Sequence, residues 1–239
     1  MPANASRVRG LFSRACRVGK VRFGKAPKPA RGARALPGLS RNGFTLIELL
    51  VVMAIIIVLA GLVLSISSYV QNKGARSRAE AEIAAMSAAL ESYKADNGIY
   101  PRSSGVTEPT TSTGSQGLSA TNHGDPTAAV YTSASFFLYG ELSGDRDGNR
   151  SITSADRRSG ETADPRSYFA FKTQMLSPIG GTATVTSIRD PFGNSYGYST
   201  ANQVNNSRGY NPTFDLWSTA GTSDASTMPP STTQWIKNW

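Results

Sequence analysis

A run of oxygen-bearing side chains lies in the middle of the chain, in the segment GDRDGNRSITSAD. Calcium takes six to eight oxygen ligands at about 2.3–2.6 Å, and side chains that alternate along a loop can wrap such oxygens around one point. The spacing therefore predicts a calcium-binding loop over residues 145–156. An Asx-rich surface turn without a metal is the other interpretation of the same residues. Counted from the first aspartate, the oxygen-bearing residues stand at places one, three, five, seven, nine and twelve: Asp145, Asp147, Asn149, Ser151, Thr153 and Asp156.

The segment resembles an EF-hand or dockerin-type loop. It ends in the short Asp156 where EF-hands use glutamate, and Arg150 stands at the sixth place where glycine is usual. Gly148 lies two residues before Arg150. Ile152, at the eighth place, is expected to anchor the loop to the hydrophobic core. The role expected for calcium is structural stiffening of the loop, because the pattern implies no open catalytic position.

The side chains that most often serve in catalysis are scarce. The chain has one cysteine, Cys16, and one histidine, His123. Cys16 lies in a basic N-terminal segment, and His123 lies in a Gly/Ser/Thr-rich stretch where a solvated loop residue is expected. Carboxylate or serine chemistry would remain, without a recognisable motif. The sequence therefore favours a protein that is not an enzyme.

A further carboxylate is conspicuous because of its apolar surroundings. Glu48 is the one acid in residues 43–64, GFTLIELLVVMAIIIVLAGLVL. Insertion scales disfavour a charged side chain in a bilayer by roughly 2.5–3.5 kcal/mol. Complementing the dipole of a helix N-terminus would offset only about 0.3–1 kcal/mol of that cost. Pairing with a group of opposite charge would offset more of the cost.

The element that carries Glu48 is expected to be a long helix. The 21 residues from Phe44 to Leu64 contain one charge, and as a helix they can cross a hydrocarbon core of about 30 Å. The helical pattern then continues until Asn97-Gly98 supplies a left-handed stop. We expect one helix from Phe44 to Asp96, about 80 Å long, whose second half packs on a globular domain. The apolar stripe of that half consists of Ala79, Ile83, Met86, Leu90 and Tyr93.

Residues 1–43 are strongly basic, with eleven Lys or Arg and no Asp or Glu. They show no sustained helical or strand period and are expected to be disordered. A nucleic-acid-binding arm is one interpretation of so many cations. A cytoplasmic flank held inside by the positive-inside rule is the interpretation we favour, because an apolar span follows at once. Nucleic acid is therefore not expected as a partner.

The segment RNGFTLIELLVVMAII resembles the prepilin-type cleavage and methylation motif of type IV pilins and pseudopilins. The resemblance implies that a membrane prepilin peptidase cuts between Gly43 and Phe44 on the cytoplasmic side, and that the new N-terminus is N-methylated. The α-ammonium of Phe44 then lies one helical turn from Glu48. In a filament, Glu48 of one subunit can meet the Phe44 ammonium of its neighbour. Many family members carry a proline near the end of the apolar run, where this chain has Ser65, so helix melting on assembly is less expected.

The segments YKADNGIYP, DPFGNSYGY and FDLWSTAG resemble the major pseudopilin of type II secretion systems. That family places calcium in its C-terminal loop. This chain keeps Asp215 and Asp224 there but has Gln234-Trp235 where an aspartate would be expected. A metal site shifted to residues 145–156 is the hypothesis that this difference motivates.

The fold class expected is α+β: a long N-terminal helix, with a membrane-spanning half and an amphipathic half, packed on a small antiparallel β-sheet as a pilin-like lollipop. Asp190-Pro191 with Gly193-Asn194 is expected to form a turn, and residues 102–128 a surface loop. The predicted β-rich runs are AVYTSASFFLYGEL, SYFAFK, TATVTSI, NSYGYS and TFDLWS. The expected parts are a removable leader (1–43), a transmembrane and assembly helix (44–66), an amphipathic helix (67–97) and a globular β-rich domain (98–239).

The function expected first is a structural subunit of a type II secretion pseudopilus, which assembles through its N-terminal helices to drive protein export. Its partners would be copies of itself, the prepilin peptidase, other pseudopilins, the inner-membrane assembly platform, and the membrane before assembly. It would cross the bacterial inner membrane once, with the globular domain in the periplasm and the filament in the periplasm or at the cell surface.

Two alternatives remain open. One is a type IV pilus subunit that serves adhesion, motility or DNA uptake. The other is a membrane-anchored calcium-dependent binding module, for which Tyr196, Tyr198 and Trp217 are candidate surface aromatics. These three aromatics are more simply interpreted as core residues of the sheet.

Overall fold

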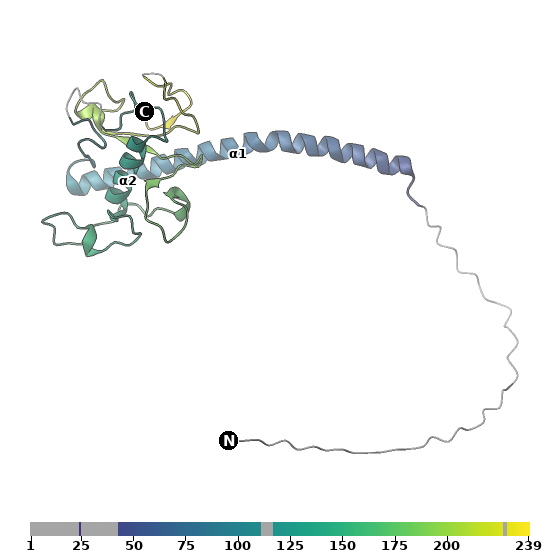
Figure 1. Cartoon of the computed structure of the whole chain (residues 1–239), viewed down its shortest axis with the longest axis horizontal. Helices are drawn as coiled ribbons and strands as arrows, with labels where there is room; N and C mark the ends of the chain where they lie inside the picture. The colour runs from purple at the N-terminus through teal and green to yellow at the C-terminus, as the bar shows by residue number, and fades with distance from the viewer. Residues whose placement is uncertain (1–23, 25–42, 111–116, 227–228) are drawn as a thin grey trace, which may run out of the picture. The chain divides into compact units, whose positions relative to one another are not determined.

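The computed structural model describes residues 24, 43–110, 117–226 and 229–239. The chain divides between Val52 and Met53 into two compact units, each described by itself below. Apart from Gly24 and Gly43, the segment 1–43 predicted to be disordered lies outside the described residues. The regular elements (Figure 1) are the helices α1 (Leu46–Asn97) and α2 (Ala129–Ser143), the short 3-10 helices η1 (Ser154–Asp156), η2 (Thr173–Met175) and η3 (Ala201–Gln203), and the strands β1 (Leu176–Ser177), β2 (Ser187–Ile188), β3 (Gly197–Ser199), β4 (Asp215–Ser218) and β5 (Ile236–Lys237).

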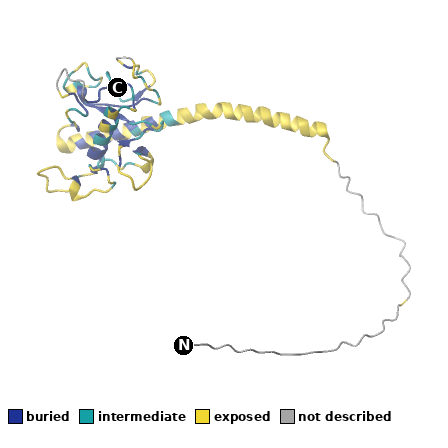
Figure 2. Cartoon of the chain, viewed as in Figure 1, coloured by how far each residue is buried: buried dark blue, intermediate teal, exposed yellow. Residues whose placement is uncertain are grey.

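The long predicted helix is confirmed as α1. It ends where the sequence places the stop, because Gly98 adopts a left-handed φ of 77° and its N–H donates to the carbonyl of Lys94 at 2.7 Å. Residues 53–74 of α1 are exposed, whereas the last part of the helix is buried on one face (Figure 2). The predicted stripe forms that face, joined by one further alanine: Ala79, Ile83, Met86, Ala89, Leu90 and Tyr93.

The α+β fold class is confirmed by two small antiparallel sheets. β3, β4 and β5 form one sheet in that order, with Tyr198 opposite Leu216, and β1 pairs with β2. Two predicted β-runs, 194–199 and 213–218, contain β3 and β4, whereas only the end of run 182–188 forms a strand, β2. The main hydrophobic core joins the buried face of α1 to residues of α2 and of both sheets.

The prediction of a strand over residues 129–142 is wrong, because this segment forms α2. Its β-branched and aromatic residues favour strands, but burial follows a helical period instead. The helix ends at Gly144, whose φ is 84° and whose N–H donates to the carbonyl of Gly140 at 3.0 Å. Residues at spacings of three and one are buried on the face that packs in the fold: Tyr131, Ala134, Ser135, Leu138, Tyr139 and Leu142.

The predicted strand at 167–172 is also wrong. The N–H groups of Tyr168 and Phe169 both donate to the carbonyl of Leu142, at 2.8 and 2.9 Å. This double contact fixes the segment to the end of α2, so its backbone donors are not used in a sheet ladder. Its aromatic residues still pack on the core, and the ring centroids of Phe169 and Phe171 lie 4.7 Å apart.

The segment 102–128, predicted to be a surface loop, contributes to a second hydrophobic cluster. Leu118 and Ala120 are fully buried in this cluster with Tyr131 and Trp217. The prediction relied on the low apolar content of the segment. A few apolar residues are enough to bury part of a loop when its polar groups form hydrogen bonds inside the protein. The hydroxyl of Ser199, for example, donates to the carbonyl of Leu118 at 2.6 Å.

Candidate functional site

The first unit contains the processing and assembly residues predicted at the start of α1. Gly43, Phe44 and Glu48 are exposed, and Phe44 is 83% exposed. The hydroxyl and the carbonyl oxygen of Thr45 both accept a hydrogen bond from the N–H of Glu48, at 3.2 and 3.1 Å. Thr45 therefore caps the helix, a role that the sequence analysis missed although the pattern T-x-x-E signals it. The carboxylate of Glu48 stands at the exposed first turn of the helix.

The apolar part of α1 offers an uncovered surface. Among the described residues, α1 is the one helix long and apolar enough to cross a membrane, judged by length and composition, and its most apolar window is 0% buried. Large apolar side chains from Leu46 to Val70 are about half exposed or more. Exposed apolar surface of this extent marks a face that contacts lipid or another protein.

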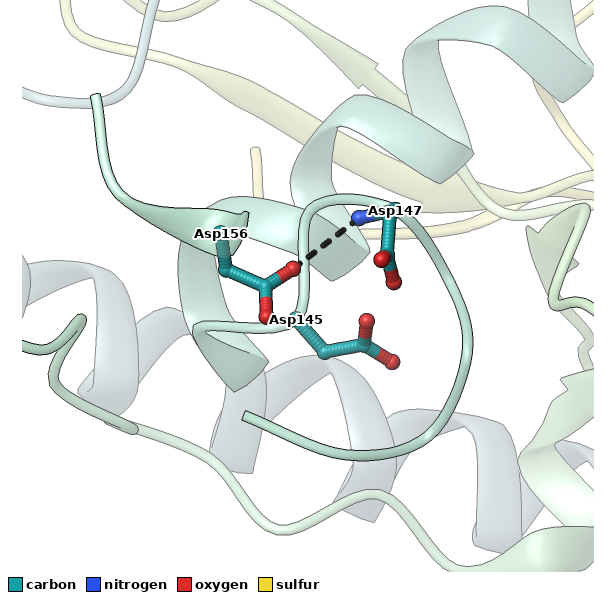
Figure 3. A group of neighbouring side chains, drawn as sticks. All are labelled: Asp145, Asp147 and Asp156. Atoms are coloured by element: carbon teal, nitrogen blue, oxygen red, sulfur yellow. Dashed lines mark hydrogen bonds between the residues drawn. The ribbon is translucent and has the colours of Figure 1, made fainter. Parts of the chain in front are cut away.

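The loop at residues 145–156 brings three of the predicted ligands together (Figure 3). Asp145, Asp147 and Asp156 each offer a carboxylate oxygen, and these oxygens lie within 4.8 Å of one another. Asp145 and Asp156 are buried, whereas Asp147 is exposed. Three carboxylates this close repel one another unless donors or a cation compensate them.

Backbone donors of the loop supply part of that compensation. One oxygen of Asp145 accepts from the N–H groups of Gly148 and Asn149 at 2.9 and 3.1 Å. The other accepts from the N–H of Arg150 at 2.7 Å and from the hydroxyl of Tyr139 at 2.6 Å. The loop is thus folded around the carboxylate of Asp145.

Asp156 closes the loop from the other end. Its Oδ1 accepts from the N–H groups of Arg146 and Asp147 at 2.8 and 3.2 Å, and its Oδ2 from the N–H of Thr153 at 2.8 Å. Burial alone would raise the pKa of Asp156, but these N–H donors together outweigh burial and lower it. Asp156 therefore favours its charged form, which is the form that ligates a metal.

The remaining predicted ligands, Asn149, Ser151 and Thr153, lie on the same loop, and Asn149 and Thr153 donate hydrogen bonds to its aspartates. The amide of Asn149 donates to Asp147 Oδ2 at 2.8 Å, and its oxygen accepts from the N–H of Ser151. The hydroxyl of Thr153 donates to Asp156 Oδ2 at 3.1 Å. The donor set is entirely oxygen, which fits calcium or magnesium and not a soft transition metal.

The sixth place of the loop adopts the conformation for which EF-hands use glycine. Arg150 has a φ of 70°, in the left-handed region. Its guanidinium donates to the carbonyls of Ala183 and Pro178 at 3.0 and 2.9 Å. These contacts hold the arginine in a backbone conformation that its side chain alone disfavours.

The prediction that Ile152 anchors the loop to the core is wrong. Its side chain is 44% exposed. It lies at the edge of a cavity of about 360 Å³ that Tyr139, Phe169 and Phe171 also line. The loop is held by the polar contacts of its buried aspartates and of Arg150, so it folds although the isoleucine is only partly buried.

A buried charge cluster beside the loop was not predicted. Glu141 of α2 accepts from the hydroxyl of Tyr93 at 2.7 Å and from Nε of Arg146 at 3.2 Å, and it also pairs with Arg158. Burial raises the pKa of Tyr93 to about 12, with the Glu141 carboxylate contributing. Arg146 also donates to the carbonyl of Asp156 at 2.6 Å, so the cluster joins the loop to both helices. Tyr93 and Glu141 are 48 residues apart, and no local pattern indicates their contact.

The other residues that the sequence singled out as candidates for function are buried or half-buried in the domain. Tyr196, Tyr198 and Trp217 are fully buried, which confirms their interpretation as core residues. His123 is half-buried rather than solvated, and burial lowers its pKa. The carboxylate of Asp215 is buried and accepts from two backbone N–H groups, those of Tyr210 and Asn211 at 2.9 and 2.8 Å.

The predicted turn at residues 190–194 is present. Asp190 Oδ1 accepts from the N–H groups of Phe192 and Asn194 at 3.0 and 2.8 Å. Trp235, at the place where the family resemblance leads one to expect an aspartate, is buried and stacks on Trp217 with ring centroids 5.7 Å apart.

Comparison with known proteins finds relatives along the N-terminal part of the chain. Residues 39–64 match the family model described as the prokaryotic N-terminal methylation motif. The type II secretion system core protein G of Pectobacterium carotovorum subsp. carotovorum is 41% identical over 64 residues, which cover 27% of this chain and 41% of that protein. The chain therefore carries the prepilin-type motif that its sequence predicts.

Two further core G proteins are also similar to part of the chain. That of Klebsiella michiganensis is 40% identical over 62 residues, covering 26% of this chain and 44% of that protein. That of Klebsiella pneumoniae is 35% identical over 91 residues, covering 38% and 59%. The chain thus spans about half the length of the curated relatives it matches. No solved structure matches the chain.

Proposed function

We propose that this protein is a structural subunit of a type II secretion pseudopilus, anchored by α1 in the inner membrane before it assembles. The observation that carries the proposal is the prepilin-type motif over residues 39–64 at the start of an exposed, membrane-length apolar helix. Similarity to three core G proteins of type II secretion systems supports it.

The chemistry of assembly follows from the residues at the start of α1. Gly43 and Phe44 are exposed, and the position of a Gly43 side chain has no neighbouring atom within 4 Å, so a prepilin peptidase could reach this bond. Cleavage there gives Phe44 an α-ammonium. In the filament, the ammonium of one subunit pairs with Glu48 of the next inside a shared apolar core. Incorrect axial registers leave both charges unpaired and are therefore disfavoured.

In this proposal the protein crosses the inner membrane once and has its globular domain in the periplasm. Its partners are copies of itself, other pseudopilins and the assembly platform, and it catalyses no reaction. A type IV pilus subunit would share the motif and the assembly chemistry, but the relatives found are named as secretion proteins. The calcium-dependent binding module is less well supported because its candidate surface aromatics are buried.

We further propose that residues 145–156 bind calcium. The carboxylates of Asp145, Asp147 and Asp156 would provide the charged ligands, and Asn149, Ser151 and Thr153 further oxygens. The clustering of the three carboxylates within 4.8 Å supports this proposal. The left-handed backbone of Arg150, which matches the demand of the sixth place, supports it too. A bound ion would replace repulsion between the carboxylates by attraction and would stiffen the loop.

Mass spectrometry of the N-terminus tests the class of the protein. The full chain is recovered from membranes of cells with an active type II secretion system and digested. The expected N-terminal peptide begins at Phe44 and carries one N-methyl group. A peptide that begins at residue 1, or an unmethylated end elsewhere in the apolar run, contradicts the proposal. Loss of enzymes from the medium on deletion favours the pseudopilin, and loss of surface fibres favours the pilin.

A further inference from the structure

One part of α1 belongs neither to the apolar run nor to the part of the helix that the domain covers. Every residue of 65–74 is exposed, Ala75 and Arg76 are the first half-buried residues, and Ala79 is the first fully buried one. The helix continues through this ten-residue segment, which we call the collar.

The collar has a mixed surface. Ile66, Tyr69 and Val70 are 58%, 68% and 58% exposed. Their spacing of three and one residues puts them on one side of the helix, and Lys73 follows on the same side. The remaining residues are Ser, Gln, Asn and Gly, and the collar contains one cation and no acid. It is too polar for a hydrocarbon core, yet it exposes more apolar area than water favours.

Some polar side chains of the collar are satisfied within the helix itself. The hydroxyl of Ser65 donates to the carbonyl of Leu62 at 2.8 Å, and the amide of Gln71 donates to the hydroxyl of Ser67 at 3.1 Å. Such internal bonds reduce the need for water and are the usual way in which Ser is tolerated at membrane depth.

We propose that the collar is a lipid-binding surface that sits in the phospholipid headgroup layer. The proposal rests on the proposed membrane anchoring of α1. Tyr69 lies five residues beyond Leu64, about 7.5 Å along the helix axis. The headgroup layer is roughly 5–8 Å deep on each side of the hydrocarbon core. Tyr69 therefore falls at the membrane interface, where tyrosine is enriched because its ring is apolar and its hydroxyl polar.

The charge of the collar selects lipid rather than a second copy as its partner. Lys73 lies farther out than Tyr69, and its long side chain can reach back to the phosphate groups of the lipids. Two collars packed side by side would instead bring like charges together. The apolar side of the collar also continues the exposed apolar surface of the helix before it. The collar thereby fixes how deep α1 lies in the membrane and where the domain begins outside it.

Spin labelling of the full chain in vesicles tests this inference. In a Cys16→Ser background, single cysteines replace Ile57, Ser68 or Ser77, three exposed positions on α1. The labelled proteins are placed in phosphatidylethanolamine–phosphatidylglycerol vesicles at low protein density, and accessibility to oxygen and to a water-soluble nickel complex is measured. We expect residue 57 to report hydrocarbon, residue 77 water, and residue 68 the interface. Tyr69→Ser should shift the residue-68 label by about 1.5–5 Å along the membrane normal, whereas Tyr69→Trp should not.

Three results would overturn the inference. If residue 68 is fully accessible to water while residue 57 lies in hydrocarbon, the collar does not lie in the headgroup layer, but α1 still anchors the protein in the membrane. If residues 57 and 68 are both fully accessible to water, α1 does not anchor the protein in the membrane, and the basis of the proposed function is lost as well. Spin–spin broadening at residue 68 that grows with protein density shows that another copy covers this side of the helix.

Discussion

At the scale of single residues, Glu141 is a buried carboxylate that has two arginines as partners. It is 6% exposed, accepts a hydrogen bond from Tyr93 and forms ion pairs with Arg146 and Arg158. Glu141→Gln should therefore lower the free energy of unfolding by about 1.5–3 kcal/mol, the range for hydrogen bonds to charged groups, because it leaves two guanidinium groups without their shared anion. Urea unfolding of a soluble fragment of residues 70–239 measures this change.

The matched control is Glu161→Gln. The side chain of Glu161 is 44% exposed and stands 4.0 Å from the same Arg158, so its loss should cost less than about 1 kcal/mol. Equal effects of the two substitutions would mean that the Glu141 cluster adds no more stability than a surface pair.

The proposed calcium binding can also be tested at single residues. Asp147 is the exposed member of the acidic loop, so Asp147→Asn should leave the calcium-free fold nearly unchanged while removing one charged ligand. We expect calcium to raise the melting temperature of the 70–239 fragment, and to raise it less in this variant. Asp164→Asn, an exposed acid outside the loop, serves as the control and should keep the full shift. If calcium does not change the melting temperature of the wild-type fragment, the proposed calcium site is contradicted.

The buried Asp190 predicts a specific dependence of stability on pH. Burial raises the pKa of Asp190 above its usual 3.8, against the hydrogen bonds from Ser218 and from three backbone N–H groups. A raised pKa in the folded state means that this group's contribution to stability is complete below the unfolded value and is lost as the pH rises through the folded value. Asp190→Asn should therefore weaken the fall in unfolding free energy that sets in as the pH rises above the unfolded value of 3.8. Parallel pH profiles for the variant and the wild type would contradict this assignment.

At the scale of elements, the spacing of apolar residues along the chain predicted helices and strands better than the types of those residues did. The stripe of α1 was predictable because its apolar residues recur over four turns without competing signals. In α2, Val130, Tyr131 and Thr132 favour a strand, although the buried positions from Tyr131 to Tyr139 repeat at spacings of three and one residues. The short strands were predictable only in part, since β1, β2 and β5 have two residues each and leave almost no period to detect.

The end of α2 provides a test of its helical assignment. Gly144 adopts a left-handed φ of 84°, and a side chain there would approach the carbonyl oxygen of Arg166 to 3.2 Å. Gly144→Ala should cost about 1–2 kcal/mol of unfolding free energy, because an L residue disfavours this conformation. Gly181→Ala is the control, since Gly181 has open space around it and no positive φ. A strand over residues 129–142 would not require glycine at position 144, and the two substitutions would then cost the same.

At the scale of the whole molecule, the parts differ in how far sequence alone could predict them. The motif at the start of α1 and the oxygen-bearing loop are local in sequence, so spacing was enough to single them out. The Glu141 cluster joins residues from α1, α2 and the segment after the loop, and only the folded chain brings them together. The exposure of Ile152 likewise depended on how the loop docks, which the EF-hand-like pattern does not specify.

The central claim is that the charge of Glu48 is tolerated because a neighbouring subunit's freed N-terminus pairs with it. We compare the full-length wild type, Glu48→Gln and the control Glu80→Gln, which removes an exposed acid from α1 outside the apolar run. Each is expressed in cells that lack the chromosomal copy, and filament length is measured by electron microscopy. We predict that Glu48→Gln is cleaved after Gly43 but forms no filaments, while Glu80→Gln assembles as the wild type does. Filaments of wild-type length from Glu48→Gln would contradict the account.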